Sequence, residues 1–191
     1  IINNPANPTG ATYTRDQLME LCEVAVAEGL LIVADEIYEK GVYDGYRFHS
    51  IASLSDKIKE KTVVINGVSK SYSMTGWRIG FAAGPREIIN AMDIIQSHAT
   101  SNPNSIAQKA AAEALSGHQS EINQMVAEFS ARRNYMLSKL RRIPDISCFE
   151  PKGAFYLFPN TSAYYNTEYG GMKIRNSYGL SYYLLKEAAV A

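Results

Sequence analysis

The sequence N-G-V-S-K-S-Y-S-M-T-G-W-R-I-G, at residues 66–80, decides the fold that we expect for this chain. It follows the β-branched run T-V-V-I at residues 62–65, which predicts a buried strand. Lys70 and Arg78 therefore lie just past a strand end, where open α/β sheets bind their ligands. The small residues around Lys70 leave room for a bulky ligand.

Lys70 and Arg78 offer complementary chemistry. The lysine amine can lose its proton and attack a carbonyl, whereas the guanidinium stays charged and can hold a phosphate through two hydrogen bonds. Together they indicate a phosphorylated aldehyde as the ligand. The run S-K-S-Y-S-M-T-G-W-R-I-G resembles the class I/II aminotransferases of fold type I, which use pyridoxal 5'-phosphate (PLP).

The resemblance implies a role for each residue of this run. Lys70 would carry PLP and act as the general base once freed, and Arg78 would clamp the phosphate. Ser69 would add a hydroxyl to the phosphate site. This chain has Gly67 where some relatives carry a phosphate-binding serine, so that contact is in doubt.

Two upstream motifs extend the resemblance: N-P-A-N-P-T-G at residues 4–10 and A-D-E-I-Y at residues 34–38. A carboxylate at Asp35 can pair with the pyridinium nitrogen of PLP and keep it protonated. Asn7 and Tyr38 would hydrogen-bond the phenolic oxygen of the cofactor. Glu36 would face the opposite side of a strand and is the weaker candidate.

The rest of the chain alternates between strand and helix patterns. Thr14 and Gln17 form a predicted capping box that opens a helix closing at Gly29, and the apolar run at residues 30–34 predicts a strand buried on both faces. This order is that of a βαβ unit. Further helices are predicted at residues 51–60, 85–98, 106–115 and 121–140, and strands at residues 81–84, 146–149 and 154–158.

We therefore expect an α/β fold, with a mostly parallel sheet and flanking helices. By resemblance, residues 1–120 are the second half of the PLP-binding large domain. Residues 121–191 are the connecting helix and part of a smaller α+β C-terminal domain. Full-length members of the family are about twice as long, so we expect a fragment. The loop that wraps the phosphate and the arginine that holds the substrate carboxylate would then lie outside the chain.

The composition argues against several classes of partner and ligand. Nineteen basic residues balance nineteen acidic ones, which favours neither nucleic acid nor a membrane surface as a partner. The arginines at residues 132–133 and 141–142 are predicted to lie on solvated helix faces. Cys22 and Cys148 have no C-x-x-C spacing, which favours a reducing compartment such as the cytoplasm. The three histidines lack metal-ligand spacing, so no metal is expected.

The expected activity is transfer of an amino group between an amino acid, of the aspartate type, and a 2-oxo acid. The loop with Thr100 and Asn102, which relatives can present to a neighbouring subunit, suggests a homodimer. The chain alone should be inactive. Two alternatives stay open: a PLP-dependent carbon–sulfur β-lyase, and the sensing domain of an aminotransferase-like transcription regulator.

Overall fold

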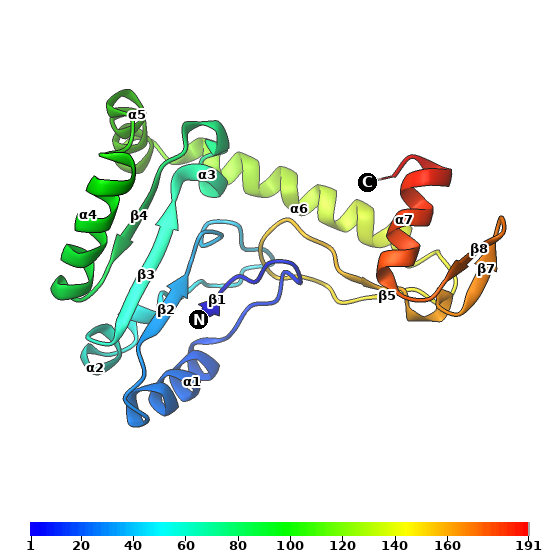
Figure 1. Cartoon of the computed structure of the whole chain (residues 1–191), viewed down its shortest axis with the longest axis horizontal. Coiled ribbons are helices and arrows are strands. Elements are labelled where there is room, and N and C mark those ends of the chain that lie inside the picture. The colour runs from blue at the N-terminus through cyan, green and yellow to red at the C-terminus, as the bar shows by residue number, and fades with distance from the viewer. Residues whose placement is uncertain (191) are drawn as a thin grey trace.

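The computed structural model describes residues 1–190. A four-stranded sheet with its helices forms one part of the molecule, and a smaller region with two short sheets forms the other. The long helix α6 (Ser120–Leu140) leads from the first part to the second (Figure 1). The division at residue 120 stays a prediction.

The main sheet has the strand order β1-β2-β3-β4. Its strands are β1 (Ile2–Asn3), β2 (Ile32–Asp35), β3 (Thr62–Gly67) and β4 (Gly80–Ala83). The first three are parallel neighbours, and β4 pairs with β3 in the antiparallel sense. The chain therefore has an α/β fold with a mixed, mostly parallel sheet.

The predicted capping box is confirmed at the start of α1 (Arg15–Ala27). The Thr14 side chain accepts a hydrogen bond from the backbone of Gln17, whose side chain accepts one from the backbone of Thr14. This fixes the first turn of the helix that connects β1 to β2, so the βαβ unit is confirmed.

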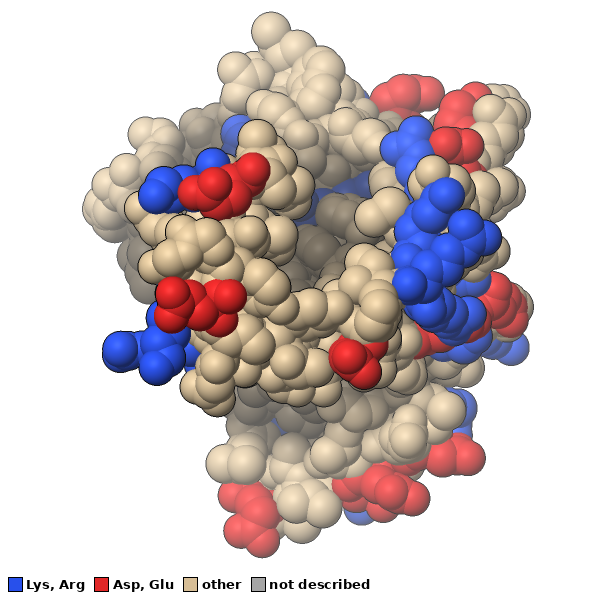
Figure 2. Space-filling view, turned by 90° about the vertical axis from the view of Figure 1, so that its right-hand side faces the viewer, with Lys and Arg blue, Asp and Glu red and all other residues tan. Residues whose placement is uncertain are grey.

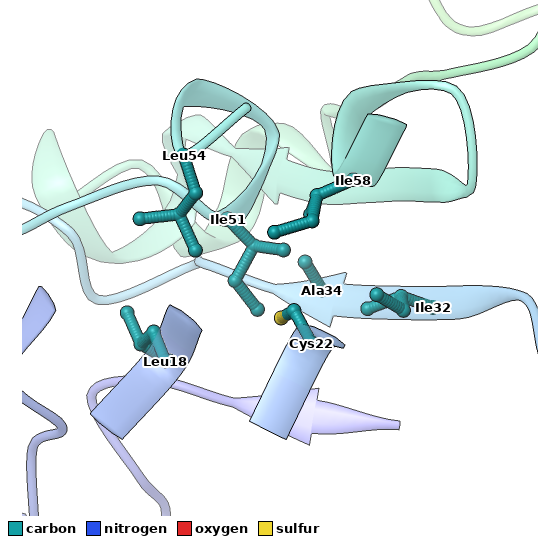
Figure 3. Close-up of a cluster of buried hydrophobic side chains, with 7 residues drawn as sticks. All are labelled: Leu18, Cys22, Ile32, Ala34, Ile51, Leu54 and Ile58. Carbon is teal, nitrogen blue, oxygen red and sulfur yellow. The ribbon is translucent and has the colours of Figure 1, made fainter. Parts of the chain in front are cut away.

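The hydrophobic core of this part lies where α1 packs on β2 (Figure 3). Leu18 and Cys22, on one face of α1, are fully buried. Full burial of a leucine side chain is worth about 1.5–3 kcal/mol, so this contact holds α1 firmly on the sheet. The buried cluster consists of Leu18, Cys22, Ile32, Ala34, Ile51, Leu54 and Ile58.

Two predicted elements around this core were wrong in their bounds. Residues 51–60 form a short 3-10 helix, η1 (Ile51–Ser53), and a separate helix, α2 (Asp56–Lys59). The Ser55 hydroxyl accepts a hydrogen bond from the Ile58 N–H and caps the second helix, which explains the break. Leu30 and Leu31 precede β2 and are about half exposed, so the buried strand begins only at Ile32.

A second buried cluster supports the segment after β3. This segment forms α3 (Val68–Ser71) and the 3-10 helix η2 (Thr75–Trp77) and leads into β4. It is followed by α4 (Arg86–Thr100) and α5 (Ser105–Ser116). The cluster joins α3, α5 and the residue before β4, and consists of Val68, Ile79, Ala107 and Ala111.

The smaller region contains β5 (Ser147–Cys148), β6 (Pro159–Asn160), η3 (Ser162–Tyr164), β7 (Thr167–Tyr169), β8 (Met172–Ile174) and α7 (Ser177–Ala188). Figure 2 shows the molecule from this end. Basic side chains gather toward the right of a central hollow, while acidic ones are spread over the face. Within residues 1–190, no helix has both the length and the apolar composition needed to cross a bilayer.

The strand predicted at residues 154–158 was wrong. Ala154 has a left-handed backbone (φ 55°), its N–H donates to the carbonyl of Gly41 (2.8 Å), and its carbonyl accepts from the Tyr43 hydroxyl. These contacts tie the segment to the loop after β2. The Phe155 and Tyr156 rings pack against Tyr38 in that loop, and Phe155 also stacks on Phe129 of α6.

Candidate active site

The carboxyl ends of three parallel strands bring the predicted residues to one edge of the sheet. Asp35, the last residue of β2, is paired in register with Asn3 of β1 and with Ile65 of β3. Asn7 lies in the loop after β1, and Lys70 lies in α3, directly after β3. Because neighbouring parallel strands end at the same edge, these side chains start from adjacent positions, as the sequence predicted.

Arg78 reaches the same edge from the other direction. Gly80 begins β4 and pairs with Gly67 at the end of β3, so the residues just before β4 lie beside those just after β3. Arg78 has a left-handed backbone (φ 56°), and its Nη1 donates to the carbonyl of Thr75 (3.0 Å). Arg78 is exposed, and its other guanidinium N–H groups form no hydrogen bond within residues 1–190, so they are available to a ligand.

Lys70 lies beside a narrow cavity of about 20 Å³, room for roughly one water molecule. Tyr38, Ser71 and Phe155 line the same cavity. The Lys70 Nζ is 5.6 Å from the centre of the Phe155 ring, so one side of the amine faces an aromatic surface and not water. The Ser71 Oγ is buried and has no hydrogen-bond partner among the described residues.

Tyr38 is buried, and its hydroxyl lies 2.5 Å from the hydroxyl of Tyr156. Burial, and then the hydrogen bond to Tyr156, raises the pKa of Tyr38 well above its usual range, with smaller contributions from the charges of Tyr156 and Asp35. Tyr38 therefore keeps its proton at neutral pH and can act as a hydrogen-bond donor.

The two adjacent carboxylates at the end of β2 have different surroundings. The Asp35 Oδ1 accepts a hydrogen bond from the Ile37 N–H (3.3 Å), and the side chain is partly exposed. Glu36 is buried and accepts from the Ile51 N–H (2.9 Å) and the Ser50 hydroxyl (3.0 Å). Burial raises the pKa of Glu36, and these hydrogen bonds oppose the rise. Glu36 thus anchors η1, which leaves Asp35 as the carboxylate available at the sheet edge.

Gly67 has no room for a side chain in this structure. A Cβ at this position would lie 2.8 Å from the carbonyl oxygen of Ile79 and 3.1 Å from the Cα of Gly80. Both atoms belong to the backbone and cannot rotate away. A side chain at residue 67 would force β3 and β4 apart, so no hydroxyl is available from this position.

Lys70 and Arg78 line different hollows. The hollow beside Arg78 has a volume of about 750 Å³ and is also lined by Trp77, Thr100 and Asn102. The loop with Thr100 and Asn102, for which a contact with a neighbouring subunit is predicted, therefore lines the same hollow as Arg78. The small cavity at Lys70 cannot enclose a pyridine ring, so a ring held there must extend into the more open space outside it.

The sequence did not predict Ser71 and Phe155, which line the cavity at Lys70, or Tyr156, which contacts Tyr38. The motif P-K-G-A-F-Y-L-F at residues 151–158 contained the signal for two of them, but its aromatic run was interpreted as a strand. Asn7 and Ser69, the remaining predicted residues, are exposed and partly exposed respectively. The Asn7 N–H donates to the Asn3 Oδ1 (2.6 Å), which shapes the loop after β1.

Arg133 corrects another expectation, because it is buried and not on a solvated helix face. Its guanidinium donates to both carboxylate oxygens of Asp44 (2.9 and 2.8 Å) and to the carbonyl of Pro151 (2.9 Å). It also lies 4.8 Å from the centre of the Tyr43 ring. The Lys152 Nζ reaches the same carboxylate at 2.8 Å. This ion cluster joins α6, the loop after β2 and the segment at residues 151–156.

We expect this cluster to make stability depend on pH. The Arg133 guanidinium, and then the Lys152 ammonium, lowers the pKa of Asp44 well below its usual range. A lowered pKa means that the stabilisation is complete above the ordinary carboxyl pKa of about 3.9 and is lost as the pH falls below it. Because Asp44 is partly exposed, Asp44→Asn should lower the free energy of unfolding at pH 7 by about 1–2 kcal/mol.

Denaturant unfolding between about pH 3 and pH 7 tests this expectation. The Asp44→Asn variant should show a smaller loss of stability on acidification than the unmodified protein. Glu128→Gln is the matched control, because Glu128 pairs with Arg132 (2.8 Å) on the same helix but both side chains are exposed. The control should change the stability by less than about 0.5 kcal/mol. Equal effects of the two substitutions would contradict the role of the buried arginine.

The residue types at this sheet edge fit PLP. Within residues 1–190, Lys70, Asp35 and Arg78 form no ion pair with another side chain. The edge therefore offers an amine, a carboxylate and a guanidinium to a ligand that carries an aldehyde, a basic ring nitrogen and a phosphate. In the same part of the chain, no group of three or more His, Cys, Asp or Glu side chains is placed to hold a metal ion.

An α/β protein with an amine, a carboxylate and a guanidinium at one sheet edge belongs to the class of proteins that can bind a phosphorylated carbonyl compound. Comparison with known proteins makes this specific: the family described as aminotransferase class I and II matches residues 1–191. The chain belongs to the class I and II aminotransferase family.

The chain is similar to curated proteins named as aminotransferases. It is 58% identical over 160 residues to an aspartate aminotransferase of Geobacillus stearothermophilus, covering 84% of this chain and 41% of that protein. It is 45% identical to a probable aspartate/prephenate aminotransferase of Rickettsia bellii, covering 100% of this chain and 48% of that protein. The chain thus spans about half the length of the curated relatives that it matches.

A solved structure supports the same fold. The chain superimposes on the aspartate aminotransferase of Rhizobium meliloti with a TM-score of 0.94 at 41% sequence identity, covering 100% of this chain and 48% of that one. The similarity extends over the sheet, α6 and the smaller region together.

Proposed function

We propose that the full-length protein is a PLP-dependent aminotransferase that moves an amino group between an amino acid of the aspartate type and a 2-oxo acid. The observation that carries this proposal is the shared sheet edge at which Asn7, Asp35, Lys70 and Arg78 start from adjacent strand ends. The family membership and the relatives named aspartate aminotransferase support the reaction and the type of substrate.

Lys70 and Arg78 would anchor the cofactor at its aldehyde and at its phosphate, respectively. The Lys70 amine would carry PLP and, when released, move the proton at the α-carbon of the substrate. Arg78 would bind the phosphate through its exposed guanidinium, with Ser69 as a second donor. The backbone contact to Thr75 leaves the remaining N–H groups of Arg78 for this role.

Asp35, Tyr38 and Asn7 would set the electronic state of the ring. PLP, when bound, supplies a protonated pyridine ring that accepts the electron pair left when the α-proton is removed. The Asp35 carboxylate would hold that ring proton. Tyr38, which keeps its own proton, would donate to the phenolic oxygen, and the Asn7 side-chain amide would donate to the same oxygen.

Assays of the full-length protein with PLP test the proposal. With aspartate as donor, the 2-oxo acid product should form only when a 2-oxo acid acceptor is present. Formation of pyruvate and ammonia from cystathionine without an acceptor would instead indicate the carbon–sulfur β-lyase. Absence of turnover with either substrate, together with ligand binding, would indicate a sensing domain. The names of the relatives favour neither alternative.

We also propose that the full-length protein is a cytoplasmic homodimer and that the chain of 191 residues alone is inactive. The hollow at Arg78, lined by Thr100 and Asn102, supports a second subunit as one of its walls. The cavity at Lys70 is too small to enclose PLP, which supports a need for further walls. Measurable transamination by the purified 191-residue chain would contradict the last point.

A further inference from the structure

Tyr156 meets the candidate site at Tyr38 and packs beside Phe155. The two hydroxyls lie 2.5 Å apart although the residues are separated by 118 positions in the sequence. The rings meet edge to face, with centres 5.7 Å apart. Among residues 1–190, the Tyr156 hydroxyl has no other hydrogen-bond partner in a side chain or the backbone.

The segment that carries Tyr156 is held from several sides. The loops that follow β2 and α6 meet beneath α6 (Figure 1), where Val42 and Gly153 form an isolated bridge. The Arg133 guanidinium binds the carbonyl of Pro151, and the Phe155 ring stacks on Phe129 of α6 with centres 5.5 Å apart. The Tyr156 hydroxyl is therefore placed by a packed support and not by a free loop.

A phenol has one proton to donate and two lone pairs that can accept. Only one of the two protons is used in the contact between Tyr38 and Tyr156, and either oxygen can be the donor. If Tyr156 donates, the proton of Tyr38 stays available for a third oxygen. Tyr38 lines the Lys70 cavity and Tyr156 does not, so a ligand at Lys70 can accept from Tyr38 while Tyr38 accepts from Tyr156.

We propose, on the basis of the proposed function, that Tyr156 is a positioning residue that acts through Tyr38: it donates its proton to the Tyr38 oxygen and so directs the Tyr38 proton to the ligand held at Lys70. Hydrogen bonds in such a chain polarise and strengthen one another. Tyr156 thus strengthens the donor that Tyr38 offers without touching the ligand itself.

Several charged and titratable groups surround Tyr38. Asp35 lies three residues before it, and Lys40, Lys70 and Tyr43 line the same cavity. Burial together with the nearby Tyr156 and Asp35 raises the pKa of Tyr38. Without a ligand Tyr38 can donate to Tyr156, which agrees with this raised pKa, whereas an oxygen acceptor at Lys70 allows the opposite direction, with Tyr156 as donor.

The pH titration of the absorbance of PLP bound to the full-length protein tests the role. A hydroxyl that donates to the phenolic oxygen stabilises its anionic form, so Tyr38→Phe should move the titration upward by about one pH unit. Tyr156→Phe should move it in the same direction by about half as much or less. In the double variant, the shift should equal that of Tyr38→Phe alone, because Tyr156 acts only through Tyr38.

Tyr164→Phe is the matched control. It also removes one tyrosine hydroxyl that forms a hydrogen bond, to the carbonyl of Pro144 (2.6 Å), but in the smaller region away from Lys70. The control should leave the titration unchanged. An unchanged titration in Tyr156→Phe, or an additional shift when Tyr156→Phe is combined with Tyr38→Phe, would overturn the proposal.

A measurement on the protein without PLP separates this proposal from the proposed function. Each single substitution should lower the denaturant midpoint, and the double variant should lie no lower than the less stable single variant. If the midpoint shifts add while the unmodified protein binds PLP normally, only the role of Tyr156 is refuted. If the unmodified protein does not bind PLP, the proposed function is refuted and the role of Tyr156 with it.

Discussion

Lys70→Ala should abolish transamination by the full-length protein. The substitution removes the amine that would carry PLP and the base that would move the α-proton of the substrate. Loss of a general base alone lowers kcat by about 10²–10⁴-fold, and loss of the covalent attachment adds to this. The measurement is kcat with aspartate and a 2-oxo acid, together with the absorbance of PLP at the protein.

The matched control is Lys109→Ala. Lys109 is an exposed lysine of α5, the helix that packs against α3, so the two substitutions remove the same side chain from neighbouring helices. The control should keep the activity and the absorbance of the unmodified protein. Retention of full turnover by Lys70→Ala would show that another group does the chemistry and would remove the basis of the proposed function.

The residues at the sheet edge were predictable because each lies next to a strand that a short stretch of sequence reveals. The residues that start from the edge each follow or precede a short strand, and the strands were marked by β-branched or apolar runs such as residues 62–65. Parallel order then places Asn7, Asp35 and Lys70 together without any knowledge of side-chain contacts. Hydrophobic pattern and strand order were therefore sufficient for this part of the candidate site.

The contacts that support the site from distant parts of the chain were not predictable in this way. Tyr156 reaches Tyr38 across 118 positions, and Arg133 reaches Asp44 across 89 positions. Each pair is created by the way α6 and the segment after it fold back on the loop after β2. A periodic pattern shows that Arg133 lies on a helix, but it does not show which carboxylate on another segment compensates its charge. The solvated face was the simpler interpretation, and burial against Asp44 overturned it.

The prediction of a strand at residues 154–158 was wrong for a related reason. Its aromatic residues have high strand propensity, which is a preference for half-buried surfaces more than for one backbone conformation. Here Phe155 packs between Phe129 and Tyr38, and the neighbouring backbone is bound to Gly41. The same composition thus builds a wall of the Lys70 cavity.

Asp35 and Glu36 are adjacent carboxylates with separate roles, so their substitutions should have different effects. Asp35→Asn should lower kcat by about 10²–10³-fold, since an amide does not carry the negative charge that holds a proton on the ring nitrogen. The stability should change little, because within residues 1–190 the Asp35 carboxylate accepts one long hydrogen bond, from the Ile37 N–H (3.3 Å). The measurements are kcat and the free energy of unfolding.

Glu36→Ala should give the opposite pattern. It removes the acceptor for the buried Ile51 N–H and the Ser50 hydroxyl, so the free energy of unfolding should fall by about 1–3 kcal/mol. The kcat of the folded protein should stay near that of the unmodified protein, because Glu36 is turned toward η1. If Glu36→Ala lost turnover while Asp35→Asn kept it, the carboxylate at the ring would be Glu36. In that case Glu36 would have to turn toward the ligand, contrary to its hydrogen bonds with Ser50 and the Ile51 N–H.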